Sequence, residues 1–444
     1  PLEVLQAVRK AVGSEFPVVV RMSADEMVPN GLTPNDSIKI AKRLEELGAD
    51  AIHVSVGNYA SFNRGYMISP MDMPDAPLVP IAERVKRSVR VPVIAVGKIR
   101  SPALANEIIH EGKADFVAIG RPLLADPDWP KKAEEGRVGE IRKCIACNQG
   151  CIIRLFAGED VWCTVNPETS RELEFAKPIP KAKKRVFIAG GGPAGMEAAR
   201  VATLRGHKVV LFEEHDSMGG ALILSSMLPY RRGWAELRDY LIEELNRLGV
   251  DVRLGTRATA ELAKREGAEV AIVAVGASQF RVDIPGIERE NVVLSRDILE
   301  GKASVLGKKV VVIGSGVSGA QIADFLAEKG YDVTIAAAGE EIARSAAVVI
   351  RSLLLERLKQ HGVRMLTNTQ ILGIEKGKVL IKGPSGSESL PADTVVVSLG
   401  VKPNNSIASE LQTAVKQVIV VGDAVEPRDA TYAMVEGARA GLSI

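Results

Sequence analysis

Two glycine-rich loops constrain the fold of this 444-residue chain more than any other feature. Each loop follows an apolar run and precedes a helical pattern, and both have the spacing G-x-G-x-x-G. In that context Gly190 permits a tight turn, Gly192 lets the backbone approach a pyrophosphate, and Gly195 allows close helix–strand packing. The second loop, from Gly314 to Gly319, repeats the pattern. The sequence therefore predicts two α/β domains that each bind a nucleotide at a helix N-terminus.

The residue that ends the strand after each loop helps to distinguish the nucleotides. Residues 208–212 form a predicted strand that ends at Glu213, where a carboxylate accepts hydrogen bonds from a ribose hydroxyl. The equivalent position after the second loop is Ala337, which departs from the usual NAD pattern. Glu340, Glu341 and Arg344 follow it, and they suit either nicotinamide form. The motif therefore indicates a nucleotide without choosing between NADH and NADPH.

Near the C-terminus a strand pattern over residues 418–422 runs into Asp423. Such an aspartate faces the ribityl chain of the flavin in two-nucleotide flavoproteins, but it is equally typical of a turn after a buried strand. Residues 270–276 and 395–400 also have an apolar run followed by glycine. We expect these two segments to cross between the nucleotide domains.

All four cysteines of the chain lie within twenty residues, with the spacing C-x2-C-x3-C-x11-C. Closely spaced thiolates with one more distant ligand are typical of iron–sulfur clusters. Structural zinc is the alternative, but it usually takes two separated pairs, and no histidine lies in the segment. We therefore expect a [4Fe–4S] cluster and a reducing compartment. The predicted metal ligands are Cys144, Cys147, Cys151 and Cys163.

The first 140 residues alternate predicted strands and helices, which indicates a parallel sheet. Strands are expected at residues 18–22, 51–54, 93–96 and 116–119, with helices at 36–47, 78–88 and 102–110. A closed eight-unit barrel needs about 250 residues. We therefore expect the C-terminal half of a (β/α)8 barrel. Its N-terminal half is either absent or supplied by another chain, and we favour absence.

Function in such barrels lies at the C-terminal ends of the strands. Arg21 closes the first strand pattern, and a surface salt bridge is its alternative role. The long segment 57–73 follows the second strand and carries Arg64 and two tyrosines. His53 lies within an apolar run, so a structural role is favoured. The ends of the last two strands form the standard phosphate site. The remaining candidates are Gly97, Lys98, Gly120, Arg121, Tyr59 and Tyr66.

Composition excludes some classes of protein. The net charge is +2, from 57 basic and 55 acidic residues, and aromatic residues make up only 4% of the chain. These values argue against a nucleic-acid partner. No apolar run reaches the roughly 18 residues of a membrane span, and no signal peptide is recognised. We expect a cytoplasmic protein with no membrane partner, and a homo-oligomer is compatible with the sequence.

The order of motifs resembles the iron–sulfur branch of the old yellow enzyme (NADH:flavin oxidoreductase) family. The resemblance rests on Ala118-Ile-Gly-Arg-Pro-Leu-Leu-Ala-Asp-Pro127, on Cys144-Ile-Ala-Cys-Asn-Gln-Gly-Cys151, and on the paired glycine loops. It covers essentially the whole chain. The three residues between Cys147 and Cys151 resemble 2,4-dienoyl-CoA reductase and 2-enoate reductase more than trimethylamine dehydrogenase.

The resemblance implies four cofactors: FMN, FAD, a [4Fe–4S] cluster and NAD(P)H. It implies an FMN domain at residues 1–140, a cluster segment and linker at 141–182, an FAD domain at 183–278 and 385–444, and an NAD(P)H domain at 279–384. FMN would be held by Arg21, Gly97, Lys98, Gly120 and Arg121. FAD would be held by Gly190, Gly192, Gly195, Glu213, Gly220 and Asp423, and NAD(P)H by Gly314, Gly316 and Gly319.

The resemblance also implies an activity, the NAD(P)H-dependent reduction of an activated C=C bond in an enoate, enone or enoyl/dienoyl-CoA. Electrons would pass from NAD(P)H to FAD, the cluster, FMN and the substrate. The alternatives are an amine dehydrogenase and an electron-delivering subunit without its own substrate site. The family's catalytic tyrosine belongs to the missing half of the barrel, and its pocket histidine is replaced near Asn58 or Tyr59. Tyr59 or Tyr66 could donate the proton instead.

Overall fold

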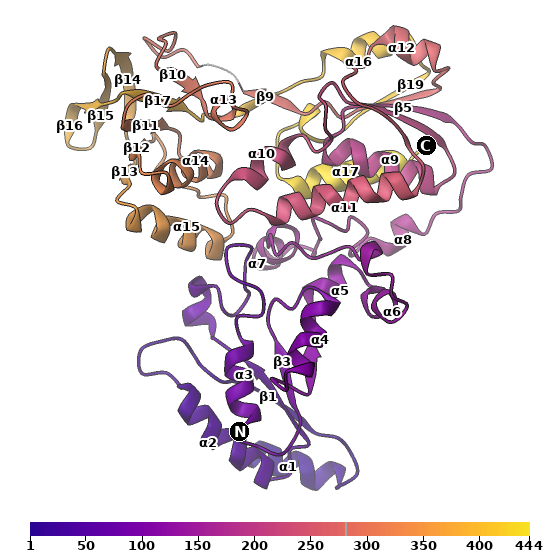
Figure 1. Cartoon of the computed structure of the whole chain (residues 1–444), viewed down its shortest axis with the longest axis vertical. Coiled ribbons are helices and arrows are strands. Elements are labelled where there is room, and N and C mark those ends of the chain that lie inside the picture. The colour runs from indigo at the N-terminus through magenta and orange to yellow at the C-terminus, as the bar shows by residue number, and fades with distance from the viewer. Residues whose placement is uncertain (280–281) are drawn as a thin grey trace. The chain divides into compact units, whose positions relative to one another are not determined.

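The computed structural model describes residues 1–279 and 282–444, which divide into two compact units (Figure 1). Residues 1–147 and 348–353 form the first unit, and residues 148–347 and 354–444 form the second. Both units are built on parallel sheets, as the sequence predicts. No helix within the described ranges combines the length and the apolar character that a bilayer crossing requires.

The first unit contains a parallel sheet in the order β1-β2-β3-β4, which follows the order of the chain. Its strands are β1 (Val19–Ser23), β2 (Ala51–Ser55), β3 (Val93–Val96) and β4 (Phe116–Ala118). The helices are α1 (Leu2–Val12), α2 (Pro34–Glu46), α3 (Val79–Lys86), α4 (Pro102–His110), α5 (Arg121–Ala125) and α6 (Trp129–Glu134). All four predicted strands and all three predicted helices are confirmed, with ends that differ by one or two residues.

Local sequence explains where the helices of this unit begin. Thr33 accepts a hydrogen bond from the Asp36 N–H, while the Asp36 carboxylate accepts one from Thr33, which is a capping box. Ser101 caps α4 in the same way by accepting from Leu104 N–H. Each cap is followed by a proline at the first helical position, where no N–H is needed. The strands then present buried Ile52, Val54, Val93 and Ala95 to these helices.

The second unit contains two parallel sheets, one for each glycine loop. The first has the order β19-β8-β5-β6-β7 and the second the order β10-β17-β11-β12-β13. The strands of the first are β5 (Arg185–Ala189), β6 (Lys208–Phe212), β7 (Asp251–Arg253), β8 (Val270–Val273) and β19 (Gln417–Val420). Those of the second are β10 (Val292–Leu294), β11 (Lys309–Ile313), β12 (Asp332–Ala336), β13 (Arg364–Leu366) and β17 (Thr394–Val397).

Helices follow the strands of both sheets. Those near the first sheet are α9 (Pro193–Leu204), α10 (Ala221–Met227), α11 (Gly233–Arg247), α12 (Ala260–Arg265), α16 (Ser406–Leu411) and α17 (Ala430–Leu442). Those near the second are α13 (Ser295–Leu299), α14 (Val317–Glu328) and α15 (Val348–Gln360). The cysteine segment adds a π-helical turn (Gln149–Ile153), α7 (Arg154–Phe156) and α8 (Glu172–Phe175).

The chain passes between the two nucleotide domains through an antiparallel pair of short strands, β9 (Ala277–Gln279) and β18 (Val401–Pro403). These strands continue the two segments that were expected to cross, so that expectation is confirmed. The second domain also carries an antiparallel sheet of β14 (Gln370–Glu375), β15 (Lys378–Gly383) and β16 (Gly386–Pro391). Because β17 then pairs with β11, residues 385–397 belong to the second domain and not to the first, where the sequence placed them.

Helix α17 lies against α9 closely enough to exclude side chains at two positions (Figure 1). A Cβ atom on Gly437 would lie 2.2 Å from the Ala194 carbonyl oxygen, and one on Gly441 would lie 2.8 Å from that of Ala198. Two glycines therefore let the last helix approach the backbone of the first motif helix. This contact brings the segment around Gly422 and Asp423 to the N-terminus of α9.

Candidate functional site

The three glycines of the first loop have different surroundings. A Cβ atom at Gly190 would lie 2.4 Å from the Ala274 carbonyl oxygen, and one at Gly195 would lie 1.9 Å from the Gly190 carbonyl oxygen. A Cβ atom at Gly192 would meet nothing within 4 Å. Backbone contacts thus require glycine at the first and third positions, whereas the second faces open space. The roles expected from the spacing match this geometry.

The second loop repeats the arrangement. A Cβ atom at Gly314 would lie 2.2 Å from the Ser398 carbonyl oxygen, and one at Gly319 would lie 2.7 Å from that of Gly314. Gly316 again faces open space at the start of α14. Two independent strand–loop–helix units therefore leave room for a ligand at the same position. The assignment of the first to FAD and the second to NAD(P)H remains a prediction.

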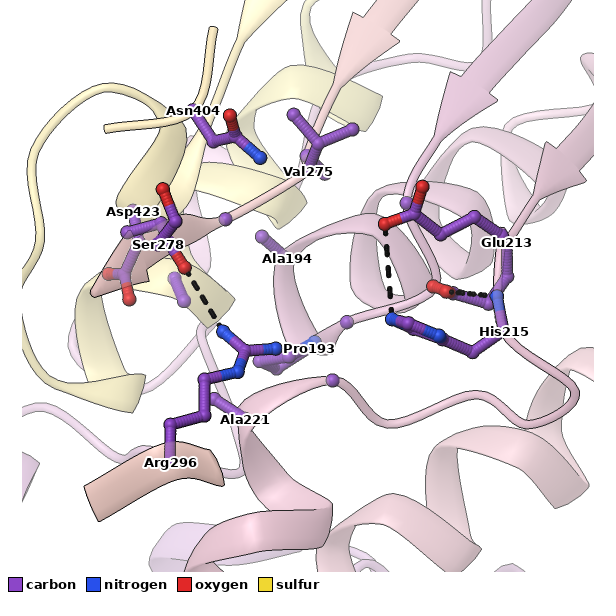
Figure 2. A pocket seen from close by; sticks show the side chains of 18 of the residues that line it. Pro193, Ala194, Glu213, His215, Ala221, Val275, Ser278, Arg296, Asn404 and Asp423 are labelled. Carbon is purple, nitrogen blue, oxygen red and sulfur yellow. Dashed lines mark hydrogen bonds and ion pairs between the residues drawn. The ribbon is translucent and has the colours of Figure 1, made fainter. Parts of the chain in front are cut away.

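A cavity of about 470 Å³ lies over the first loop. Figure 2 shows Pro193 and Ala194, at the start of α9, between Glu213 on one side and Asp423 on the other. The cavity therefore has an acidic acceptor at each end and a helix N-terminus between them. Two carboxylate acceptors on either side of the N–H donors of a helix N-terminus fit a dinucleotide whose pyrophosphate lies at the helix. Its lining includes the predicted FAD residues Gly190, Gly192, Glu213, Gly220 and Asp423.

Glu213 is nearly buried and is held by the backbone. Its carboxylate accepts hydrogen bonds from the Gly191 N–H at 2.7 Å and from the His215 N–H at 2.9 Å. A carboxylate has about four acceptor positions, so two remain for ribose hydroxyls. The strand end that the sequence singled out thus carries an oriented acceptor in the cavity.

Asp423 occupies the other end of the cavity and is braced by α17. Burial raises the pKa of its carboxyl, although the Arg428 N–H, which donates to it at 3.1 Å, acts in the opposite direction. The Arg428 guanidinium pairs with Glu436, which also accepts a hydrogen bond from the Gly422 N–H at 2.8 Å. The Gly422–Asp423 turn is therefore held beside α9 by a network of charged side chains, and it does not merely end a strand.

Replacing Asp423 with asparagine should stabilise the FAD-free protein at pH 7 and weaken FAD binding. A carboxyl whose folded pKa lies above its unfolded value of about 3.9 costs stability at high pH, because the folded state holds its proton more tightly. That cost disappears as the pH falls through the folded pKa toward the unfolded one. Urea unfolding at pH 7 and pH 4.5 measures it. Equal midpoints for both proteins at pH 7 would contradict the prediction.

The sequence did not reveal that the second domain also lines this cavity. Leu294, Arg296 and Asp297, at the end of β10 and the start of α13, belong to the lining. The Arg296 guanidinium donates to the Ala277 carbonyl oxygen at 3.3 Å. No motif marks these residues, because only the return of the chain through β9 brings them to the first loop. The cavity is thus shared by both nucleotide domains.

The first two cysteines lie in the first unit, in a segment without helix or strand. Cys144 and Cys147 are buried, and the Ala146 N–H donates to the Cys144 sulfur at 3.4 Å. Ala146 and Asn148 both have positive φ angles, 53° and 57°. The Arg100 guanidinium donates to the Cys144 carbonyl oxygen at 2.9 Å. An N–H directed at a cysteine sulfur is one of the features that tune iron–sulfur sites.

The other two cysteines, Cys151 and Cys163, lie in the second unit. They directly follow Gly150 and Trp162, two residues whose backbones are in close contact. The Trp162 N–H donates to the Gly150 carbonyl oxygen at 2.7 Å. A Cβ atom on Gly150 would lie 2.8 Å from the Trp162 carbonyl oxygen, so only glycine fits there. Because Cys151 follows Gly150 and Cys163 follows Trp162, this contact brings the two cysteines together.

The donor set fits an iron–sulfur cluster. No three or more His, Cys, Asp or Glu side chains of the described residues converge closely enough to hold a single metal ion. In a [4Fe–4S] cluster each thiolate binds a different iron atom, so its ligands need not converge on one point. Four thiolates are the soft ligands that such clusters take. The assignment of the four cysteines as ligands remains a prediction.

Two barrel candidates pair across strands of the first unit. Arg21 lies in the middle of β1 and not at its end, and it pairs with His53 on β2. Burial, with a contribution from the Arg21 charge, lowers the pKa of His53. The His53 Nε2 atom is buried and has no hydrogen-bond partner among the described residues. An unsatisfied polar atom at this place fits a bound ligand, and the structural role expected for His53 stays a prediction.

The ends of β3 and β4 carry the predicted phosphate residues. A Cβ atom on Gly97 would lie 2.7 Å from Leu78, whereas Gly120 faces open space. The Lys98 ammonium turns into the protein, where it donates to the carbonyl oxygens of Met71, at 3.2 Å, and Met73. Burial lowers the pKa of Lys98 to about 8. The Lys98 side chain therefore holds the loop after β2. Only the backbone of Lys98 is then left to contact a phosphate. Arg121 begins α5 beside Gly120.

The loop after β2 forms a short 3-10 helix (Tyr59–Arg64) that Asn58 caps, in place of the irregular segment that was expected. Tyr59 is 77% exposed, and Tyr66 is partly buried. The structure does not bring the two tyrosines together with Arg21 or Lys98 through any contact seen among the described residues. A proton-donating role for either tyrosine remains a prediction.

Comparison with known proteins decides the family. Residues 1–140 match the NADH:flavin oxidoreductase / NADH oxidase family, and residues 184–437 match pyridine nucleotide-disulphide oxidoreductases. The chain belongs to the iron–sulfur branch of the old yellow enzyme family. The two family matches imply FMN, FAD and NAD(P)H, and the related enoate reductases carry a [4Fe–4S] cluster. The family and cofactors expected from the sequence are therefore confirmed.

Several members of this iron–sulfur old yellow enzyme branch are similar over nearly the whole chain. NADH oxidase from Thermoanaerobacter brockii is 41% identical over 96% of this chain and 66% of its own length. Cinnamate reductase from Clostridium sporogenes is 32% identical over 97% and 67%. The structure of 2-naphthoyl-CoA reductase with 2-naphthoyl-CoA has a TM-score of 0.95 at 32% identity, over 100% and 67%.

Amine-oxidising members are also similar. N,N-dimethylglycine/sarcosine dehydrogenase from Chromohalobacter salexigens is 35% identical over 91% of this chain and 61% of its own length. The chain thus spans about two thirds of the length of the relatives it matches.

Proposed function

We propose that this flavoprotein uses NAD(P)H to reduce an activated C=C bond in a small unsaturated acid, ketone or CoA thioester. The observation that carries the proposal is the cavity shared by both nucleotide domains, together with the intact second glycine loop of the second nucleotide domain. That arrangement supports a nicotinamide nucleotide as the source of electrons. Similarity to a cinnamate reductase and a 2-naphthoyl-CoA reductase supports an unsaturated substrate.

Within this proposal each group of residues has a binding or orienting role. Glu213 and Asp423 would fix the two ends of FAD, while the N-terminus of α9 holds its pyrophosphate. Arg21, Gly97, Lys98, Gly120 and Arg121 would hold FMN, and Arg21 would oppose negative charge on its ring. Cys144, Cys147, Cys151 and Cys163 would bind the cluster. When bound, the flavins supply hydride and single-electron chemistry, and the cluster supplies single-electron transfer.

Oxidation of an amine is the second candidate, because an amine-oxidising relative is 35% identical. An enzyme that sends electrons outward needs no working nicotinamide site. The second loop keeps all three glycines in the geometry that leaves space for a nucleotide, so the reductase is favoured. An electron-delivering subunit without a substrate site is the third possibility. We further infer a cytoplasmic location, supported by the reducing conditions that four thiols need, and a homo-oligomer stays a prediction.

Anaerobic titration with NADH and NADPH, followed by a panel of enones, enoates, enoyl-CoA thioesters and methylated amines, tests the proposal. We expect NAD(P)H to bleach the flavin absorbance and one panel alkene to restore it, with one saturated product formed per nucleotide oxidised. Bleaching by an amine, with no response to either nucleotide, would establish the amine dehydrogenase instead. Bleaching by NAD(P)H that no alkene reverses would favour the electron-delivering subunit.

A further inference from the structure

Trp162, the residue before Cys163, carries an arginine on each face of its indole ring. The guanidinium carbon of Arg154 lies 3.6 Å from the ring centre, and that of Arg171 lies 3.7 Å from it. Two groups this close to one centre cannot share a face, so they lie on opposite sides. Tyr432 meets the ring edge, with 5.6 Å between centroids and 69° between the planes. The stack fixes two cations beside a predicted cluster ligand.

The two arginines differ in how their charge is balanced. Arg154 pairs with the Glu159 carboxylate at 2.7 Å. Arg171 is only 9% exposed and donates to two backbone carbonyl oxygens, those of Pro167 and Thr169, at 3.2 and 3.4 Å. It forms no ion pair with any carboxylate of the described residues, and its Nη2 atom has no hydrogen-bond partner there.

Arg171 therefore brings an unbalanced positive charge into the protein. Glu174 lies on the same short helix region, but its carboxylate is engaged by Arg439 at 2.8 and 3.1 Å. Burial lowers the pKa of Arg171 to about 10, which still leaves the guanidinium charged at neutral pH. A buried charge normally has a partner of opposite sign, because its burial is otherwise expensive. The arrangement indicates an anion next to the Trp162–Cys163 segment.

We propose that Arg171, stacked on Trp162, is the counter-charge of the iron–sulfur cluster and raises its reduction potential. The inference rests on the cluster site of the proposed function. Four thiolates give such a cluster a net negative charge, which grows by one when it accepts one electron, without making or breaking a bond. A nearby cation stabilises the reduced form more than the oxidised form. Arg154 acts in the same direction, but more weakly because Glu159 neutralises it. The charge of Arg171 thus makes it easier for the cluster to accept an electron.

A redox titration of the holoprotein with dithionite, followed by electron paramagnetic resonance, tests this proposal. Arg171→Gln should lower the equilibrium constant for one-electron reduction about tenfold, which is about 59 mV more negative. Arg171→Lys, which keeps the charge, should restore most of the potential. Arg154→Gln should shift the potential in the same direction by less. Arg205→Gln is the matched control, because Arg205 also donates to two backbone carbonyl oxygens, those of Lys177 and Pro178, and should leave the potential unchanged.

Iron and sulfide content is measured for every variant. Arg171→Gln with a full cluster and an unchanged potential would overturn the proposal. If Arg171→Gln loses its cluster, the other two variants decide. The proposal is supported if Arg171→Lys keeps the cluster and Arg154→Gln has a more negative reduction potential. An unchanged potential in Arg154→Gln overturns the proposal. Because dithionite supplies the electrons, the potential of the cluster can be measured even if the protein reduces no alkene. A failure of the proposed function is therefore distinguishable from a failure of this inference. A wild-type protein without iron would overturn the cluster site itself, and the counter-charge with it.

Discussion

Replacing Cys147 with serine is expected to abolish NAD(P)H-driven alkene reduction while NAD(P)H still reduces FAD. Cys147 is buried between Ala146 and Asn148, which both have positive φ angles, and serine is close to cysteine in size, so the fold should survive. A hydroxyl is a much harder ligand than a thiolate and suits iron–sulfur clusters poorly. The loss should reach at least the roughly 100-fold that changes in the outer shell of a metal site produce.

The proposed FAD site provides the internal control for this Cys147→Ser experiment. It lies within residues 190–433, apart from Cys147 in the sequence, and its glycine and carboxylate contacts do not involve the cysteine. Stopped-flow bleaching of FAD by NAD(P)H should therefore match the wild type, whereas alkene consumption and iron content fall together. If the iron-depleted variant still reduced the alkene at the wild-type rate, the cysteine site would not lie on the path of the electrons.

Much of the fold could be predicted because its signals are local. A glycine loop between a strand and a helix specifies its own turn, and both predicted loops do begin directly after a strand, β5 or β11. The alternation in the first unit was equally informative, since its strands are short apolar runs separated by helical patterns. The predicted domain boundary after residue 384 was wrong because β16 pairs with β15, and β17 pairs with β11, which comes much earlier in the chain.

The parts of the site that escaped prediction depend on contacts between distant segments. Arg296 reaches the cavity only because β9 and β18 pair, and no spacing in the sequence encodes that approach. The faces of Trp162 are covered from two sides by arginines that are eight and nine residues away. A tryptophan beside a cysteine gives no such signal. The orphaned Nε2 atom of His53 could not be foreseen either, because an apolar run hides whether a ring nitrogen finds a partner.

Changing Gly195 to alanine should destabilise the proposed FAD domain. Alanine would gain roughly 1 kcal/mol of helix propensity over glycine. Its Cβ atom, however, would lie 1.9 Å from the Gly190 carbonyl oxygen, a backbone atom in a turn that itself cannot move, since Gly190 approaches Ala274. Overpacking commonly costs about 1–3 kcal/mol even where side chains can yield. The clash should therefore outweigh the propensity gain, and urea unfolding of the FAD-free protein should show a lower midpoint.

Gly192→Ala is the matched control, because its Cβ atom would meet nothing within 4 Å. We expect it to leave the urea midpoint of the FAD-free protein unchanged while weakening FAD binding, since the methyl group would occupy the space through which the backbone approaches the pyrophosphate. Gly319→Ala should fall between the two in stability, because its Cβ atom would stand 2.7 Å from the Gly314 carbonyl oxygen. Wild-type stability in Gly195→Ala would show that Gly195 is not needed for packing. Unchanged FAD affinity in Gly192→Ala would show that Gly192 is not needed for the approach of the ligand.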